Sequence, residues 1–167
     1  EIIGKIDLGD MAFLMLRDRI PTKRESVVFN ALLVTLVEHG ITPNAIATRL
    51  TYWGAPESLQ GAVAAGLLGL GSRFVGTIGD SARLVQEALK DSPPDTDLDA
   101  LARDIVNTYR QSKRPIPGLG HPVHKPVDPR TLRLFEIASE NGFSGRYVQL
   151  MQLIGNEAER VHKRQLP

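Results

Sequence analysis

The chain has 167 residues, with 20 lysine and arginine residues against 19 aspartate and glutamate residues and a formal net charge of +1. This length suits one domain or most of one, and the charge balance lacks the basic surplus typical of proteins that bind nucleic acid or an anionic membrane. The absence of cysteine excludes disulfides, thiol catalysis and thiolate metal sites, and it is compatible with a reducing cytoplasm, where we expect the protein to act without a membrane partner.

Two helices are predicted at the start of the chain. The first runs from residue 8 to residue 19 and ends at Ile20-Pro21. Thr22 and Glu25 then have the spacing of a capping box, in which each side chain binds the backbone N–H of the other residue. The helix that follows runs to about residue 39. Because it is apolar on most sides, we expect it at the centre of the core.

Two further helices are predicted before residue 80. One starts at Thr42-Pro43 and ends near Gly54, and the next starts at residues 55–57. The segment 58–79 contains many glycine and alanine residues, although each glycine inside a helix costs up to about 1 kcal/mol relative to alanine. Such a composition indicates a close backbone approach. Tight packing against another helix is the favoured explanation over a ligand, and small residues also suit a subunit interface.

Four helices are predicted in the second half of the chain. They run from an Asp80-Ser81 cap to about Lys90, from a Thr96 cap onward, from Pro129 to Asn141, and from about residue 144 to residue 164. The last helix has an apolar stripe at helical spacing. That stripe consists of Tyr147, Leu150, Met151, Ile154, Ala158 and Val161.

Asp95, Asp97 and Asp99 lie at the predicted start of one of these helices, where acidic side chains are favoured, and we interpret them as capping residues rather than a cation site. No metal site is predicted. The sequence has no convincing alternation of polar and apolar residues of the kind that strands require. About eight helices with short connections predict an all-α domain.

The segment 114–130, RPIPGLGHPVHKPVDPR, is the most distinctive in the chain. Its prolines and glycines favour a stiff loop rather than a helix. Asp128-Pro129 is a typical helix start, and it places Arg130 in the first turn, where a cation opposes the helix dipole. An anionic ligand between the helix start and Arg130 would reconcile the two. The alternative is an ordinary connector followed by an ordinary cap.

This segment resembles the active-site loop of the citrate synthase superfamily. That loop carries a proline, Gly-x-Gly-His, a basic residue four places after the histidine, and Asp-Pro-Arg from the seventh place. The matching residues here are Pro117, Gly118, Gly120, His121, Lys125, Asp128, Pro129 and Arg130. The likeness extends from about residue 8 to residue 167. EHGITPNAIATRL resembles a substrate-binding histidine segment of the family, and GDMAFLMLRDRIPT resembles its entry helix.

The resemblance implies a helical large domain, a small domain that closes on it, and a symmetric homodimer. We therefore expect residues 1–80 to be large-domain helices that form a dimer interface. Residues 81–167 would be mostly small domain and would carry the active-site loop 114–130.

One departure from the family pattern favours one branch of it. SRFVG stands where citrate synthases have Leu-His-Gly-Gly, and Phe74 is at or near the position of the histidine that polarises the acetyl thioester. Citryl-CoA lyases and the homologous part of ATP-citrate lyase have Arg-Phe-x-Gly there. The favoured function is cleavage of citryl-CoA to acetyl-CoA and oxaloacetate, or the reverse condensation. Citrate synthase activity stays open, as does a non-catalytic CoA-binding or interaction module.

A second departure concerns the end of the chain. The family's catalytic aspartate lies in an Asn-Val-Asp segment soon after the last predicted helix, and the sequence stops at Pro167, before such a segment. We therefore expect a citrate synthase-like helical domain that is truncated at its C-terminus.

The resemblance also implies roles for individual residues. His121 would be the catalytic hydrogen-bond donor and acid–base group. The oxaloacetate part of the substrate would be bound by His39, Arg130 and Arg49. Coenzyme A would be bound by Lys125, Gly118, Leu119, Gly120 and Arg114. The coenzyme A thioester is then a substrate, and no bound cofactor or metal is expected.

Overall fold

A computed structural model of the chain describes residues 2–38, 40–71, 76–120 and 127–163. Within these ranges it consists of helices and contains no strand, which confirms the all-α prediction for this part of the chain. The helices are α1 (Leu8–Arg17), α2 (Lys23–Leu36), α3 (Pro43–Gly54), α4 (Leu59–Leu68), α5 (Gly76–Leu89), α6 (Leu98–Gln111), α7 (Pro129–Glu140) and α8 (Arg146–His162). None of these described helices combines the length and the apolar character that crossing a bilayer requires.

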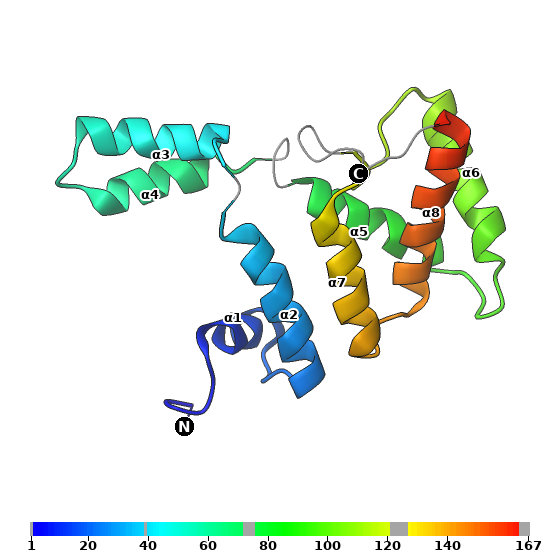
Figure 1. The fold of residues 1–167 in the computed structure, drawn as a ribbon, viewed down its shortest axis with the longest axis horizontal. Helices are drawn as coiled ribbons and strands as arrows, with labels where there is room; N and C mark the ends of the chain where they lie inside the picture. The colour runs from blue at the N-terminus through cyan, green and yellow to red at the C-terminus, as the bar shows by residue number, and fades with distance from the viewer. Residues whose placement is uncertain (1, 39, 72–75, 121–126, 164–167) are drawn as a thin grey trace.

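The helices form three groups according to which of them contact one another. Helix α8 packs on α5 and α6, helix α2 packs on α1 and α7, and helix α3 packs on α4. Figure 1 shows α3 and α4 as an antiparallel pair at one side of the molecule, with α5, α6 and α8 at the other side. Helix α2, with α1 beside it, lies between the two sides, and α7 overlaps the start of α5 in this view.

The main core lies between α5, α6 and α8. Leu150, Ile154 and Ala158 of α8 are completely buried, so the apolar stripe predicted for this helix faces the core. The remaining core residues are Val85, Leu89, Ala102 and Val106. Tyr147, at the start of the predicted stripe, is instead 52% exposed. The core thus begins one turn into the helix.

The prediction that α2 lies at the centre of the core is wrong. The helix has no buried residue, and Val34 and Leu36 are 70% and 56% exposed. Helix α2 contacts α1 and α7. A helix that is apolar on most sides needs neighbours on most sides to be covered. These two neighbours therefore cover only part of its apolar surface.

Three predicted helix starts differ from those in the structure. Helix α5 begins at Gly76, so Asp80 lies inside the helix rather than capping it, and it pairs with Arg83 on the helix surface. Helix α4 begins after Ser58, because residues 55–58 form a turn closed by the Ser58 N–H and the Ala55 carbonyl. Helix α6 is capped by the aspartate that follows the predicted threonine.

Asp97 is this N-cap, and its carboxylate accepts hydrogen bonds from the backbone N–H groups of Asp99 and Ala100, both at 3.0 Å. A carboxylate caps orphan N–H groups well and is also favoured by the helix dipole. The interpretation of this acidic stretch as capping residues is confirmed for Asp97.

The glycines of α4 allow α3 to approach closely. A Cβ atom on Gly66 would lie 2.1 Å from the Thr48 hydroxyl oxygen, and one on Gly69 would lie 3.2 Å from the Asn44 Cα atom. Ala62, on the same helix, is completely buried. Helix-on-helix packing therefore explains Gly66 and Gly69, and for these two glycines the favoured explanation is confirmed.

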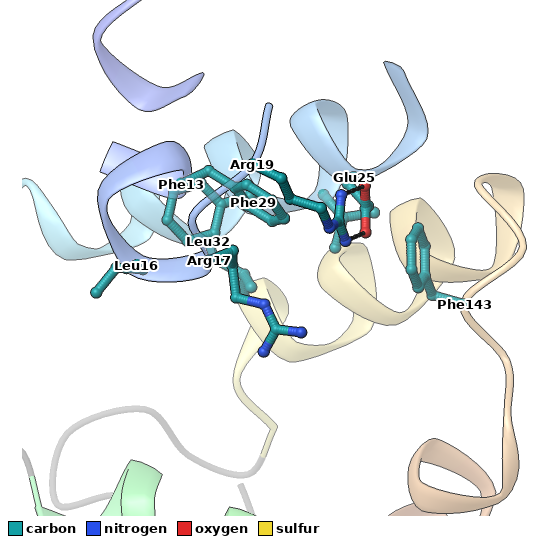
Figure 2. A pocket seen from close by; sticks show the side chains of 9 residues that line it. Phe13, Leu16, Arg17, Arg19, Glu25, Phe29, Leu32 and Phe143 are labelled. Atoms are coloured by element: carbon teal, nitrogen blue, oxygen red, sulfur yellow. Dashed lines mark hydrogen bonds and ion pairs between the residues drawn. The ribbon is translucent and has the colours of Figure 1, made fainter. Parts of the chain in front are cut away.

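Aromatic packing joins α1 to α2. The Phe13 and Phe29 rings meet edge-to-face with their centroids 5.3 Å apart, and Figure 2 shows the two rings between the helices. The Arg19 guanidinium lies over the Phe13 ring at 5.2 Å from its centroid. Such contacts fix the angle at which the chain turns from α1 into α2.

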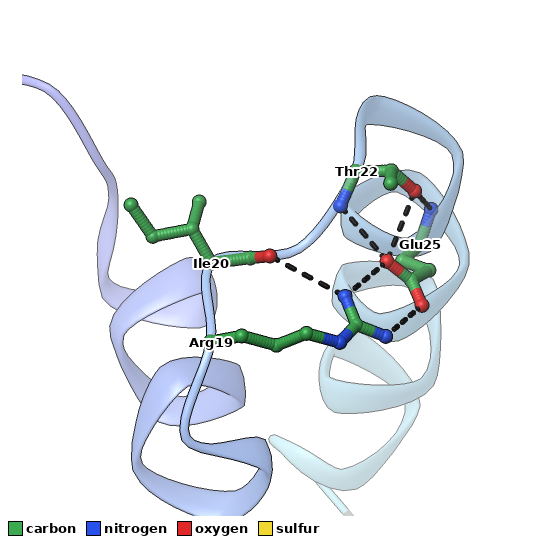
Figure 3. Close-up of polar contacts among 4 residues, drawn as sticks. All are labelled: Arg19, Ile20, Thr22 and Glu25. Carbon is green, nitrogen blue, oxygen red and sulfur yellow. Dashed lines mark hydrogen bonds and ion pairs between the residues drawn. The ribbon is translucent and has the colours of Figure 1, made fainter.

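The predicted capping box at the start of α2 is confirmed (Figure 3). The Thr22 hydroxyl accepts a hydrogen bond from the Glu25 N–H at 3.3 Å, and the Glu25 carboxylate accepts one from the Thr22 N–H at 2.9 Å. Arg19 binds the same carboxylate through two nitrogens, at 2.8 and 2.5 Å. The hydrogen bond from Arg19, followed by that from the Thr22 N–H, lowers the pKa of Glu25 from 4.5 to about 2.

This lowered pKa predicts a local acid sensitivity. The ionised Glu25 carboxylate stabilises the fold above about pH 4.5, and the stabilisation is lost as the pH falls toward about 2. Urea unfolding should therefore show Glu25→Gln less stable than the natural chain at pH 7, with the gap narrowing between pH 4.5 and pH 2. The control is Glu57→Gln, which removes an exposed carboxylate between α3 and α4. A gap independent of pH would contradict the prediction.

Candidate functional site

The turn from Arg114 to Gly120 is fixed to the core at two points. Ile116 and Leu119 both pack against the buried cluster of α5, α6 and α8. The Leu119 N–H donates to the Ile116 carbonyl at 3.3 Å and closes the turn between them. The expected stiff loop is thus held by apolar side chains, and its backbone is left toward the surface.

Two glycines of this turn have backbone angles that other residues rarely adopt. Gly118 has φ of 84° and Gly120 has φ of 93°, both in the region that favours glycine. Gly118 also lies against its neighbours, because a Cβ atom there would be 2.8 Å from the Ser81 hydroxyl oxygen and 3.3 Å from the Met151 methyl group. At Gly118 both the backbone angle and the available space require glycine, whereas at Gly120 the angle alone does.

A groove of about 710 Å³ lies on one side of the turn. Its walls come from the first turns of α5, from the turn itself and from the first turns of α7. The lining residues outside the turn are Thr77, Ile78, Asp80, Ser81, Thr131 and Leu134. The groove therefore joins the glycine-containing turn to the start of the helix that follows the predicted active-site loop.

A second hollow, of about 380 Å³, lies on the other side of the turn and is basic. Arg110, Lys113, Arg114 and His162 line it, and its lining contains no carboxylate among the described residues. The Arg114 guanidinium lies 5.6 Å from the centroid of the Tyr109 ring. Arginine and lysine side chains with no acidic partner in the lining suit the phosphate groups of a ligand.

Arg130 lies at the start of α7, where Asp128 caps the helix. The Asp128 carboxylate accepts from the Arg130 N–H at 3.0 Å, and it also binds the Arg130 side chain at Nε (3.0 Å) and Nη2 (2.6 Å). This hydrogen bonding raises the pKa of the Arg130 guanidinium. The Asp128 carboxylate therefore balances the positive charge of Arg130 at the helix start. The unfavourable position of Arg130 relative to the helix dipole does not by itself require an anionic ligand.

The structure brings some of the predicted site residues together. Arg114, Gly118, Leu119 and Gly120 all belong to the turn between the groove and the basic hollow. Arg130 precedes Thr131 of the groove wall. Arg49 is exposed on α3 and lines neither hollow.

The other predicted site residues lie outside the described part of the chain. They are His39, His121 and Lys125, together with Phe74 of the SRFVG segment. Among the described residues, no group of three or more histidine, aspartate or glutamate side chains is arranged to hold a metal. The roles assigned to His39, His121 and Lys125 stay predictions.

Sequence reasoning missed several residues of these two hollows, among them Ser81, His162 and Arg110. Ser81 contacts the turn from α5, although the two are far apart in the sequence, so no local pattern indicates the contact. His162 reaches the basic hollow from the end of α8, also far from the turn in the sequence. Arg110 could have been found, because it stands close to Lys113 and Arg114 in a basic stretch at the end of α6.

Sequence comparisons find relatives of this chain among known proteins. The family model described as "Citrate synthase, C-terminal domain" matches residues 5–166. A "Probable ATP-citrate synthase" of Dictyostelium discoideum is 26% identical over 145 residues, which are 86% of this chain and 22% of that protein. The chain thus spans less than a quarter of this relative.

Two solved structures resemble the chain closely. Citryl-CoA lyase from Hydrogenobacter thermophilus is 36% identical, with a TM-score of 0.87, and the match covers 99% of this chain and 62% of the lyase. ATP citrate lyase from Methanothrix soehngenii, solved in complex with citrate and coenzyme A, is 20% identical, with a TM-score of 0.81 over 98% of this chain and 26% of its own, and this likeness concerns the fold alone. The chain belongs to the citrate synthase family, whose C-terminal domain it matches along nearly its whole length.

Proposed function

We propose that this chain is part of an enzyme that cleaves citryl-CoA to acetyl-CoA and oxaloacetate, or catalyses the reverse condensation. The observation that carries the proposal is the likeness to citryl-CoA lyase, at 36% identity over 99% of the chain. The Arg-Phe-x-Gly sequence at residues 73–76 points to the same branch of the family. Neither observation distinguishes cleavage from condensation.

Coenzyme A is proposed to bind along the turn 114–120. Two features of the described site support this proposal. The basic hollow offers Arg110, Lys113, Arg114 and His162 to phosphate groups. The backbone of the turn lies beside both hollows, where glycine leaves no side chain between it and a ligand. Lys125 is proposed to add charge to this site.

Arg130 is proposed to bind a carboxylate of the citryl or oxaloacetate unit. A guanidinium has five N–H donors. Asp128 engages Nε and Nη2, and Nη1 makes no hydrogen bond to a described residue. The Arg130 side chain is 32% exposed. Asp128 therefore positions the guanidinium and leaves one edge of it for a ligand.

His121 is proposed as the acid–base group of the reaction. Cleavage breaks the bond between the carbinol carbon of the citryl unit and the methylene carbon of the acetyl thioester. The hydroxyl proton passes to His121 as the ketone of oxaloacetate forms, and the electron pair of the broken bond stays with the acetyl unit as an enolate. Protonation of the enolate at carbon by a carboxylic acid, the role that the resemblance gives to the family's catalytic aspartate, then gives acetyl-CoA. His39 and Arg49 are proposed to hold the oxaloacetate unit.

A homodimer is proposed, with residues 1–80 providing its interface. The exposed apolar surface of the α3–α4 pair supports this proposal. Leu50, Trp53 and Leu68 are 68%, 88% and 88% exposed, and large apolar patches of this kind mark interaction surfaces. Residues 81–167 are proposed to be mostly small domain. Helix α5 (Gly76–Leu89) crosses the proposed boundary at residue 80.

The test is an assay of citryl-CoA cleavage, in which the reduction of the released oxaloacetate is used to measure its formation. It should be run on this chain and on the longest natural protein that contains it. Oxaloacetate formation by either one supports the proposal. If neither releases oxaloacetate but both bind coenzyme A, the alternative of a non-catalytic CoA-binding module is favoured. Release of free citrate from acetyl-CoA and oxaloacetate would favour citrate synthase.

In whichever of the two proteins cleaves citryl-CoA, Arg130→Gln should lower kcat/KM by about a hundredfold. The reason is that charge-assisted hydrogen bonds to a carboxylate are worth roughly 1.5–3 kcal/mol each. Arg133→Gln is the matched control on the same helix, since Arg133 is exposed and pairs with Glu136 and Glu140. An equal loss in both variants would argue against a substrate contact at Arg130.

A further inference from the structure

A third hollow, separate from the turn 114–120, lies between α1, α2 and the connection from α7 to α8. Its volume is about 310 Å³, at the lower end of the range typical of small-molecule sites. Its walls are mainly apolar: Phe13, Leu16, Val28, Phe29, Leu32 and Phe143. Figure 2 shows the Phe13 and Phe29 rings on one side of this hollow and the Phe143 ring, from the α7–α8 connection, on another.

Three charged side chains complete the lining: Arg17, Arg19 and Glu25. Two of them neutralise each other, because Arg19 binds both oxygens of Glu25 at 2.8 and 2.5 Å. The Arg17 guanidinium makes no hydrogen bond or ion pair with a described residue, and in Figure 2 it lies apart from the Arg19–Glu25 pair. The lining therefore carries one net positive charge, that of Arg17.

We propose that this hollow binds a small amphiphilic monocarboxylate, such as a fatty acid of about eight carbons, with its tail among the rings and its carboxylate on Arg17. The apolar walls match the tail, since burying each methylene group contributes about 0.8 kcal/mol. The planar guanidinium matches a carboxylate, which it can bind through two parallel hydrogen bonds.

The charge of the hollow also excludes other ligands. A polyanion such as the coenzyme A head group needs several cations, and Arg17 is the one lining cation without a carboxylate partner among the described residues. An uncharged apolar ligand would make no use of the guanidinium, which is exposed to solvent. The proposal shares no residue with the citryl-CoA site, so the two stand or fall separately.

Calorimetric titration of this chain with octanoate, 1-octanol and acetate tests the proposal. Octanoate should bind at one site per chain, with a negative heat-capacity change from the buried tail. Octanol supplies the tail without the charge, and acetate supplies the charge without the tail. Both should bind at least about tenfold more weakly than octanoate, because each lacks one of the two interactions.

Three substitutions locate the site. Arg17→Gln should weaken octanoate binding by about tenfold, and Arg17→Lys by less, since it keeps the charge and loses the planar fork. Leu32→Glu places a carboxylate in the wall at a residue that is 45% exposed, so the fold should tolerate it while octanoate binding is lost. Arg103→Gln is the control, because Arg103 is an exposed arginine of α6 that does not line the hollow.

Several results would overturn the proposal. Octanol binding as tightly as octanoate would show that Arg17 has no role, and so would an unchanged affinity in Arg17→Gln. Octanoate binding that competes with coenzyme A would place the ligand elsewhere. If sedimentation shows that Leu32→Glu dissociates a dimer while octanoate does not bind the natural chain, a second copy of the chain covers this surface instead.

Discussion

Replacing Leu150 with alanine should lower the free energy of unfolding by about 2–5 kcal/mol, a large share of the stability of an ordinary domain. Leu150 is completely buried between α5, α6 and α8, together with Ile154 and Ala158. Removal of its side chain loses the apolar contacts and leaves a cavity that the three helices close only in part. Urea unfolding followed by circular dichroism measures the change.

The matched control is Leu132→Ala on α7, where the leucine is 57% exposed. This variant should lose about 1 kcal/mol or less, because little surface returns to water and no cavity forms. Both variants remove the same atoms from a helix, so their difference isolates burial. Similar losses would mean that the described core does not dominate the stability of the chain.

Local patterns in the sequence were sufficient for the elements that depend on near neighbours. The capping box of α2 involves residues three positions apart, and the stripe of α8 involves one face of one helix. The surroundings of α2 could not be predicted in this way. An apolar helix needs cover, but its sequence does not identify the partner, and α1 and α7 supply only part of it.

In the candidate site too, features set by neighbouring residues could be predicted, and contacts between distant segments could not. The Asp128-Pro129 start of α7 and the positive φ angles of Gly118 and Gly120 follow from intrinsic residue preferences. The role of Asp128 as the partner of the Arg130 side chain is also local, but an acidic cap and an anionic ligand satisfy the same charge, so the sequence could not distinguish them. The contact of Ser81 with the turn joins distant segments and needed the structure.

Gly118→Ala should weaken coenzyme A binding by about tenfold to a hundredfold, since displacement of a binding element by about 1 Å has effects of this size. An alanine there meets two penalties. Its φ of 84° lies in the left-handed region, which costs about 1–2 kcal/mol for an L-residue, and its Cβ would lie 2.8 Å from the Ser81 hydroxyl oxygen. Relief of that contact moves the turn away from α5 and α8.

Gly120→Ala separates the two penalties. Gly120 has a similar φ of 93°, yet a Cβ atom there would have no described atom within 4 Å. It should therefore cost stability through the backbone angle alone and weaken coenzyme A binding less than Gly118→Ala. Adding Ser81→Ala to Gly118→Ala removes the nearest clashing atom and should restore part of the affinity, whereas Ser81→Ala with Gly120→Ala should restore none. Calorimetric titration of coenzyme A measures all four variants. Equal effects at the two glycines would mean that contact with α5 does not position the turn.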